Sequence, residues 1–288
     1  MKIFYSSKCL RYGSSEHPES PERVFSTVKF LKEKGFEFIE PKPCSEENLL
    51  LAHSKEHVEK IKNEEFWDPD TPAYPGIFDL ARLAAGSAIE AMKTTLKGEN
   101  SFSLMRPPGH HAGIDGKALG TSSLGFCYFN NIAIATKFAQ EKMGVKKVLI
   151  LDIDCHQGNG SQEIFLGNPM VLYISLHRFP FYPGTGEKSK ENCLNYTLSS
   201  ETTEEEYLKI LAKALEEVKK FNPDLIGVSA GFDAYKEDPL AGLNLEKQTY
   251  QKIGKMIKDL KKPTFIVLEG GYGKDFPECV YQFLKGLK

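Results

Sequence analysis

Acidic, imidazole and amide side chains are concentrated in the segment LDIDCHQGNG, residues 151–160. Asp154 and His156 are two residues apart, so in an extended chain their side chains project to the same side and can face one centre. Asp233, in the segment AGFDA, follows another apolar run in the same way. One imidazole nitrogen and two carboxylates leave coordination positions open for water and substrate, as a catalytic zinc ion requires. These three residues are therefore candidate metal ligands, although the run from Asp152 to His156, taken alone, is as well explained by capping of a strand end.

Two consecutive histidines, His110 and His111, follow the segment RPPG. In most backbone conformations the rings of neighbouring residues diverge, so the pair can supply two separate acid–base groups with Asp152 and Asn159 as their partners. A histidine pair taken alone is more often part of a surface loop, but the rigid RPPG before it and the glycine-rich segment after it favour a built site. Tyr272, in EGGYG, is either a packing residue or a hydroxyl that the flanking glycines deliver to the same site.

Short β-rich runs alternate with segments of helical periodicity, which is typical of a parallel α/β sheet. The expected strands are residues 2–6, 101–105, 147–153, 170–176, 224–230 and 264–270, and several of them are apolar almost throughout. The expected helices are residues 22–34, 79–96, 130–142, 203–220 and 246–261. Because the carboxyl ends of such strands face a common crevice, the glycine-rich loops that follow them are predicted to converge on one site. No repeat or linker divides the chain, so residues 1–288 are expected to form a single domain.

Composition excludes several classes of function. The formal net charge of -2 comes from 37 basic and 39 acidic residues without a basic tract, so nucleic acid is not the expected partner. The first residues lack the apolar core of a signal peptide, and no run approaches the roughly 20 apolar residues of a membrane span. The six cysteines show no CxxC spacing, so reduced thiols and a cytoplasmic location are expected. The oligomeric state is not indicated.

Six segments together resemble the zinc-dependent histone deacetylase family, in the spelling of its class II-like and bacterial members: RPPGHHA, GFCYFNN, DIDCHQGNG, HRFPFYPGTG, AGFDA and LEGGYG. The resemblance runs from HPESPER at 17–23 to Tyr272. It implies an α/β domain of the arginase–deacetylase fold, with an eight-stranded parallel sheet and helices on both faces. It also implies hydrolysis of an N-acyl-lysine amide in a protein or peptide by metal-activated water.

The resemblance assigns roles residue by residue. It implies that one catalytic Zn²⁺ is bound by Asp154, His156 and Asp233. The acid–base residues that it implies are His110, backed by Asp152, and His111, backed by Asn159. It makes Tyr272 the hydroxyl that holds the substrate carbonyl. A buried aspartate favours an imidazolium more than an asparagine does, so His110 is expected to hold its proton more readily than His111.

Further residues are implied to bind the substrate or to surround the metal. Phe126 and Tyr182, with Gly125 and Gly271, would line the acyl-lysine channel, and many relatives have phenylalanine in place of Tyr182. Asp70 resembles a rim aspartate that grips substrate backbone amides, and Arg23 resembles an arginine of an internal cavity behind the zinc. A structural K⁺ site is implied for the main-chain carbonyls of Asp152, Asp154, His156 and Leu176 with the hydroxyl of Ser175.

Other activities compete with this reading. An acetylated polyamine or other small amine is the main alternative substrate, although the loop insertion typical of polyamine-specific relatives is not evident. The sequence does not indicate whether a longer acyl chain or a lactyl group is preferred. An arginase-like pair of Mn²⁺ ions is disfavoured because no aspartate lies two residues from Asp233. A catalytically silent acyl-lysine reader is disfavoured because the tyrosine, both histidines and all three candidate ligands are present.

Overall fold

The computed structural model describes residues 1–240 and 242–288. Eight strands form one parallel sheet in the order β2-β1-β3-β10-β9-β6-β7-β8. Their bounds are β1 Lys2–Phe4, β2 Phe38–Ile39, β3 Ser101–Ser103, β6 Val148–Asp152, β7 Val171–Arg178, β8 Cys193–Leu198, β9 Leu225–Ala230 and β10 Thr264–Leu268. A separate antiparallel pair comprises β4 Ala112–Gly113 and β5 Gly116–Lys117. The eight-stranded parallel sheet is thereby confirmed.

The central strands are apolar throughout because both of their faces are covered. In β6, Leu149 and Leu151 pack into one core cluster, whereas Val148 and Ile150 pack into a second cluster on the opposite face. This alternation is the two-residue period of a strand. Every residue of β6, β9 and β10 is buried.

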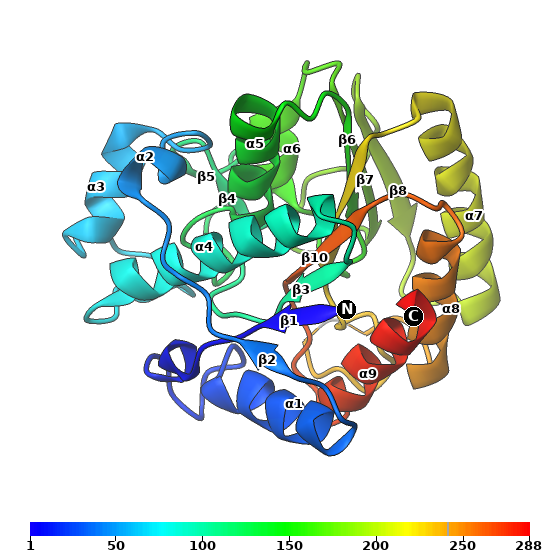
Figure 1. Ribbon diagram of the computed structural model, residues 1–288, viewed down its shortest axis with the longest axis horizontal. Helices are drawn as coiled ribbons and strands as arrows, with labels where there is room; N and C mark the ends of the chain where they lie inside the picture. Colours follow the sequence, from blue (N-terminus) through cyan, green and yellow to red (C-terminus); the bar gives the residue numbers. More distant parts are fainter. Residues whose placement is uncertain (241) are drawn as a thin grey trace.

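Helices cover both faces of the sheet (Figure 1). One face is covered by α1 Pro21–Glu33, α7 Glu204–Phe221, α8 Lys247–Lys258 and α9 Phe276–Leu287. The other is covered by α2 Glu46–Leu49, α3 Lys55–Lys62, α4 Ile77–Leu96, α5 Asn131–Met143 and α6 Asn159–Phe165. A short 3-10 helix, η1, spans Ser7–Leu10. The five helices expected from periodicity correspond to α1, α4, α5, α7 and α8, with bounds that differ by at most three residues.

Local signals set the ends of several helices. At the start of α7 the hydroxyl of Thr203 accepts a hydrogen bond from the N–H of Glu206, and the Glu206 carboxylate accepts one from the N–H of Thr203. This reciprocal capping box satisfies two of the amide groups that a helix start leaves without intrahelical partners. Acidic residues in the first turn and lysines in the last also match the helix dipole.

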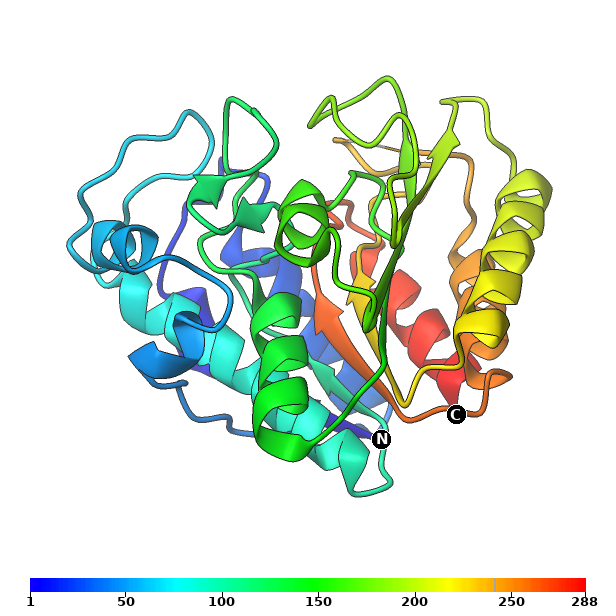
Figure 2. The ribbon, with the colours of Figure 1, turned by 90° about the horizontal axis from the view of Figure 1, so that it is seen from above.

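The long loops gather at the carboxyl ends of the strands, and both chain termini lie toward the opposite end of the strands (Figure 2). These loops follow β3, β6, β7, β9 and β10. All six cysteines are buried and free. Among the described residues, no helix is both long and apolar enough to cross a membrane.

Candidate active site

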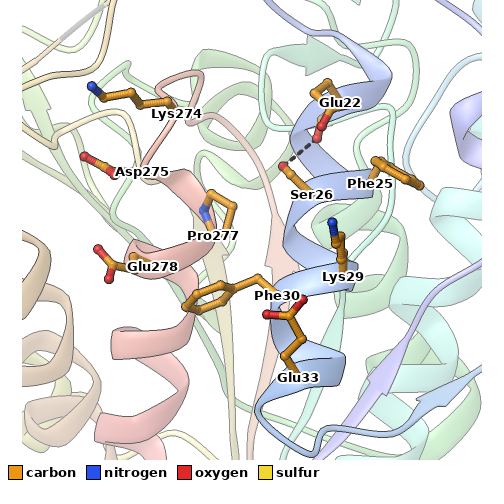
Figure 3. Close-up of a pocket in the computed structure, with 10 residues that line it drawn as sticks. All are labelled: Glu22, Phe25, Ser26, Lys29, Phe30, Glu33, Lys274, Asp275, Pro277 and Glu278. Carbon is orange, nitrogen blue, oxygen red and sulfur yellow. Dashed lines mark hydrogen bonds between the residues drawn. The ribbon is translucent and has the colours of Figure 1, made fainter.

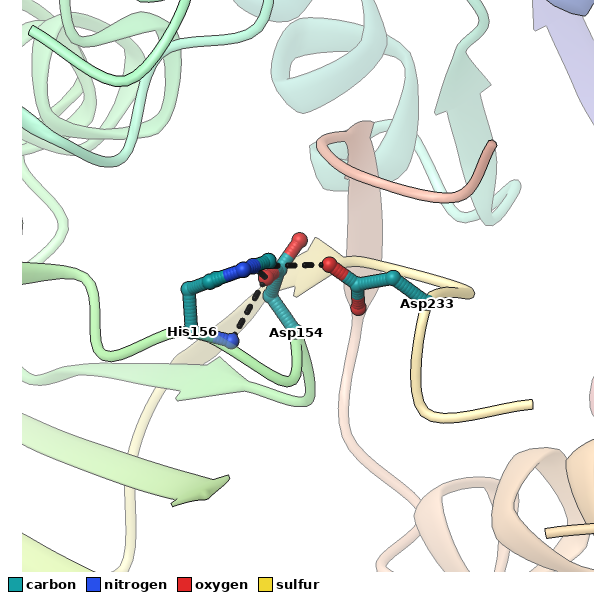
Figure 4. Close-up of side chains that lie close together, drawn as sticks. All are labelled: Asp154, His156 and Asp233. Carbon is teal, nitrogen blue, oxygen red and sulfur yellow. Dashed lines mark hydrogen bonds and ion pairs between the residues drawn. The ribbon is translucent and has the colours of Figure 1, made fainter. Parts of the chain in front are cut away.

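Asp154, His156 and Asp233 lie together in the loops that follow β6 and β9 (Figure 4). Their candidate ligand atoms are all within 4.8 Å of one another, and all three residues are buried. The chain is not extended here as the sequence argument assumed. The carboxylate of Asp152 accepts the N–H of Asp154 (3.2 Å), and that of Asp154 accepts the N–H of His156 (2.9 Å). Two successive turns of this kind, in which an aspartate caps the backbone two residues on, therefore bring Asp154 and His156 together.

Both carboxylates are aimed by backbone donors. Asp154 Oδ2 accepts the N–H of Gly270 (2.8 Å), and Asp233 Oδ1 accepts the N–H of Cys155 (2.8 Å). The other oxygens, Asp154 Oδ1 and Asp233 Oδ2, lie 3.0 and 2.9 Å from Nδ1 of His156. Asp233 Oδ2 is buried and, among the described residues, has no hydrogen-bond partner of good geometry.

The charges in this group favour a cation. Burial and the neighbouring Asp154 raise the pKa of Asp233 to about 7. Burial lowers the pKa of His156, but the two carboxylates outweigh it and raise that pKa to about 10. A nitrogen donor with two carboxylates, one of which has a buried oxygen without a well-formed hydrogen bond, is a donor set that suits Zn²⁺.

The two histidines next to this group are held by different partners. His110 Nδ1 lies 3.0 Å from Asp152 Oδ2, which also accepts the hydroxyl of Tyr173 (3.1 Å). His111 Nδ1 lies 2.7 Å from Asn159 Oδ1, and the Asn159 amide donates to the carbonyl of Ala118 (3.0 Å). Since the amide group of Asn159 is oriented by Ala118, its oxygen faces His111, which therefore carries its hydrogen on Nδ1.

The expectation that the two rings diverge was wrong. Their centroids are 4.1 Å apart and their planes are inclined by 46°. Burial lowers the pKa of His110, but Asp152 and then Asp154 outweigh burial and raise it to about 10. Burial and then the neighbouring His110 hold the pKa of His111 well below its ordinary value. One histidine of the pair thus favours the charged form and the other the neutral form.

A pocket of about 190 Å³ opens above these groups. Its lining consists of Asp70, His111, Gly125, Phe126, His156, Phe181, Tyr182, Leu240 and Tyr272. The ring of Phe181 stacks on His156, with centroids 5.3 Å apart and an angle of 24°. The hydroxyl of Tyr182 accepts a hydrogen bond from Ser123 Oγ (3.0 Å) and donates one to the carbonyl of Ser123 (3.3 Å), so the polar atom that distinguishes it from phenylalanine is paired. The pocket wall is therefore largely aromatic.

A second hollow, of about 450 Å³, lies between α1 and the start of α9 (Figure 3). Charged side chains and Phe25, which is 51% exposed, line it, but none of the predicted site residues does. This hollow is larger than the first pocket, but it lacks the predicted site residues that line the first pocket.

The wall at Gly125 and Phe126 has an unusual backbone. Both residues have positive φ, +54° and +68°, which costs energy at the non-glycine position. The N–H of Gly125 donates to Asp70 Oδ1 (3.1 Å), and that of Phe126 donates to Thr71 Oγ1 (2.8 Å). A Cβ on Gly125 would lie 2.4 Å from Cδ2 of His111, so only glycine fits. Asp70, expected as a rim residue for substrate amides, thus also binds the protein's own channel wall.

Arg23 lies behind Tyr272. Its guanidinium donates to the carbonyl of Gly271 (2.6 Å) and to Glu19 Oε1 (2.9 Å), and its Cζ is 4.7 Å from the centre of the Tyr272 ring. Gly271 has φ +119°, and a Cβ there would lie 2.6 Å from the ring of Phe276. The backbone of Tyr272 is held from the other side by Asp238, whose Oδ2 accepts its N–H (2.7 Å). The tyrosine is therefore fixed at both its ring and its backbone.

The residues of the implied K⁺ site lie on the neighbouring strands β6 and β7 and in the loop that follows β6. Asp152 at the end of β6 is the register partner of Ser175 on β7, which precedes Leu176. Ser175 Oγ is 2.9 Å from Nδ1 of His177. Potassium binding at this position stays a prediction.

Several residues that build the site were missed in the sequence. Glu269 binds two backbone amides of the histidine loop, and the fully buried Arg106 forms a two-pronged ion pair with Glu19. Phe181 packs on His156. Glu269, Arg106 and Phe181 lie inside the segments LEGGYG, RPPGHHA and HRFPFYPGTG. For Glu269 and Arg106, a charged residue close to the end of a buried strand was an available signal.

Comparisons with known proteins agree with this geometry. Residues 17–287 match the histone deacetylase domain. A probable deacetylase from Methanothermobacter thermautotrophicus is 36% identical over 308 aligned residues, covering 100% of this chain and 90% of that protein. A crystal structure of the HDA15 HD domain has a TM-score of 0.90 and 32% identity, covering 100% of this chain and 90% of that one. An acetylpolyamine aminohydrolase from Burkholderia pseudomallei has a TM-score of 0.84 and 26% identity, covering 99% and 98%. A match of this extent, over a sheet of the same architecture, places the chain in the histone deacetylase family.

Proposed function

We propose that this protein is a zinc-dependent deacylase that hydrolyses the amide bond of N-acyl-lysine in a protein or peptide. The observation that carries the proposal is the floor of the smaller pocket. There a nitrogen-and-two-carboxylate group adjoins two histidines whose partners differ in charge. Amide hydrolysis needs a nucleophile at neutral pH, a base for its proton and a donor for the developing oxyanion. Residues at this floor would hold the metal ion that activates a water molecule, and His111 and Tyr272 would serve as the base and the donor.

Asp154, His156 and Asp233 would hold the zinc ion. The buried oxygen of Asp233 that lacks a well-formed hydrogen bond and the cluster of ligand atoms within 4.8 Å support this assignment. When bound, Zn²⁺ would lower the pKa of a water ligand to about 7 and would act as a Lewis acid toward the carbonyl oxygen. Three protein ligands leave room for both water and substrate.

His111 would act as the general base and then as the general acid. Its partner, Asn159, is neutral, so its imidazole is available to take a proton from the attacking water and to return it to the leaving amine. His110 would remain protonated because the carboxylate of Asp152 stabilises its charge, and it would contribute mainly electrostatic stabilisation.

Tyr272 would donate a hydrogen bond to the oxyanion. Burial raises the pKa of its hydroxyl well above the ordinary value, so the proton needed for donation stays on the oxygen. Phe126 and Tyr182, with Gly125, would enclose the lysine methylenes, and Asp70 at the rim would bind the peptide backbone. The K⁺ site on β6 and β7 would stiffen the chain that carries the zinc ligands.

An acetylated polyamine is the second candidate substrate, and the similarity to an acetylpolyamine aminohydrolase supports it. The test is a panel of acetyl-lysine peptides, longer acyl-lysine peptides and acetylated polyamines offered to the zinc-loaded protein. Tyr272→Phe is expected to lose about 10²- to 10³-fold in kcat, the usual loss for one oxyanion donor. Release from peptides that the variant loses supports the proposal. Release from polyamines alone, or from no substrate, contradicts it.

A further inference from the structure

Glu269 is a buried carboxylate that the proposed chemistry does not use. It directly follows β10 and precedes the Gly-Gly-Tyr segment. Its Oε2 accepts the backbone N–H groups of Gly109 (2.7 Å) and His110 (3.1 Å), and its Oε1 accepts the hydroxyl of Ser229 on β9 (3.0 Å). A charge out of contact with water is costly unless it is well hydrogen-bonded, and here three donors satisfy it.

The two amides are the first that the histidine loop offers. Pro107 and Pro108, immediately before them, have no backbone N–H and cannot be anchored in this way. The hydrogen bonds from Gly109 and His110 therefore fix the backbone at the start of the histidine pair. No other carboxylate accepts these two amides among the described residues.

The main chain of Glu269 belongs to the loop that carries Tyr272. Its N–H donates to the carbonyl of Ala230 (3.0 Å), and its carbonyl accepts a hydrogen bond from Nη2 of Arg23 (2.6 Å). The side chain thus reaches the histidine loop while the backbone is fixed in the tyrosine loop. One residue joins the two loops.

We propose that Glu269 is a positioning residue that holds the histidine pair at a fixed separation from the hydroxyl of Tyr272. The proposal rests on the proposed function, because it concerns the relative placement of a base and an oxyanion donor. Reaction rates depend steeply on such placement, and a displacement of about 1 Å can cost on the order of 10²-fold. Substrate contacts in the pocket wall are made by other residues, so the effect is expected in kcat and not in KM.

Two substitutions separate the effect of the length of the Glu269 side chain, its reach, from the effect of its charge. Glu269→Asp keeps the charge but is one methylene shorter, so it cannot bind both amides while Arg23 holds its carbonyl. Glu269→Gln loses the charge but keeps the reach, because its amide oxygen can accept both N–H groups and its NH₂ can donate to Ser229. Positioning predicts that kcat falls about 10²-fold in the aspartate variant and stays within about tenfold of wild type in the glutamine variant, with KM little changed in both.

Hydrogen exchange of the Gly109 and His110 amides is measured on the same zinc-loaded proteins. Both amides are expected to exchange faster in Glu269→Asp and at the wild-type rate in Glu269→Gln. Ser103→Ala is the control, because it removes another buried hydrogen bond, to Ser87 (2.7 Å), from the strand that leads into this loop. It is expected to lower stability without changing kcat or these two exchange rates.

The outcomes are distinct. If the glutamine variant is as slow as the aspartate variant, charge and not reach is what matters, and the proposal is wrong. If the aspartate variant keeps wild-type kcat and exchange, it is also wrong. If Glu269→Asp does not fold, fast exchange in Glu269→Gln alone overturns the proposal, and protected amides with retained kcat support it. If the wild-type protein hydrolyses none of the substrates, the proposed function fails, while the exchange rates still decide whether Glu269 holds the loop.

Discussion

His53 offers a test of how burial governs the pH dependence of stability. It lies between the β4–β5 hairpin, which follows His111, and the start of α5. Its Nδ1 donates to the carbonyl of Gly113 (2.8 Å), and its Nε2 accepts the N–H of Asn130 (2.8 Å). Since one ring nitrogen donates to a carbonyl and the other accepts from an amide, the ring is neutral. Burial, with a smaller contribution from neighbouring His57, lowers the pKa of His53 from 6.5 to about 3.

The sign and size of the effect follow from linkage. The folded state holds the pKa below that of the unfolded state, so the unfolded state binds more protons and stability falls as the pH falls. The contribution is complete above pH 6.5 and is lost progressively toward pH 3. Between pH 7 and pH 5 the loss is about 2 kcal/mol, and by pH 4 it is about 3 kcal/mol.

The assay is urea unfolding of wild type and His53→Gln at pH 7, 5 and 4. Glutamine can still accept the N–H of Asn130 but leaves the carbonyl of Gly113 without its donor, so the variant is less stable at pH 7 by about 1–3 kcal/mol. This gap should shrink by about 2 kcal/mol at pH 5, because the variant lacks the titrating group. Any effect of pH on zinc binding is common to both proteins.

Val58→Ala, in α3, is the control for a simple loss of stability, because it removes buried apolar atoms without removing a titrating group. Its difference from wild type is expected to be the same at all three pH values. A gap between wild type and His53→Gln that is equal at pH 7 and pH 5 would refute the reasoning, because it would mean that His53 titrates alike in both states.

Two further predictions concern the pocket floor. His111→Ala is expected to lower kcat by about 10²- to 10⁴-fold, the range for a general base, and His110→Ala by less; a steady-state assay in which only His110→Ala is inactive would reverse their roles. Zn²⁺ at about 100 times its Kd is expected to stabilise the metal-free protein by about 2.7 kcal/mol, a rise of several degrees in Tm. Asp233→Asn should abolish this rise in a thermal unfolding scan, and Asp79→Asn, on the exposed side of α4, should retain it; a rise in both variants would place the ion elsewhere.

Much of the fold could be predicted because local patterns agree with the final packing. The apolar runs of β6, β9 and β10 are buried on both faces, so they are recognisable without knowledge of their neighbours. The strands of the eight-stranded sheet that were not expected, β2 and β8, lie at its two edges and are only partly buried, and the short pair β4 and β5 was not expected either. Their hydrophobic pattern is weaker because their side chains are only partly covered. α9 was overlooked although its inner face is apolar.

The site could be predicted as a set of residues but not as an arrangement. That Asp154, His156 and Asp233 follow strands is visible in the sequence, and parallel strands bring such positions together. The turns at Asp152 and Asp154, which replace the extended chain, depend on side-chain-to-backbone hydrogen bonds that sequence spacing does not specify. The close packing of the two histidine rings is also not specified by spacing, because each ring is oriented by a different side chain, Asp152 or Asn159.

The remaining part of the site depends on contacts between residues far apart in the chain. Arg23 reaches the carbonyls of Glu269 and Gly271, and Arg106 reaches Glu19. Glu19 lies between the two guanidinium groups, and its carboxylate pairs with both. A buried ion pair of this kind is weak evidence for stability, since desolvation offsets much of the attraction, but removal of one partner is costly. These residues therefore join the N-terminal segment to the histidine and tyrosine loops, so the placement of Tyr272 depends on a residue some 250 positions away in the sequence.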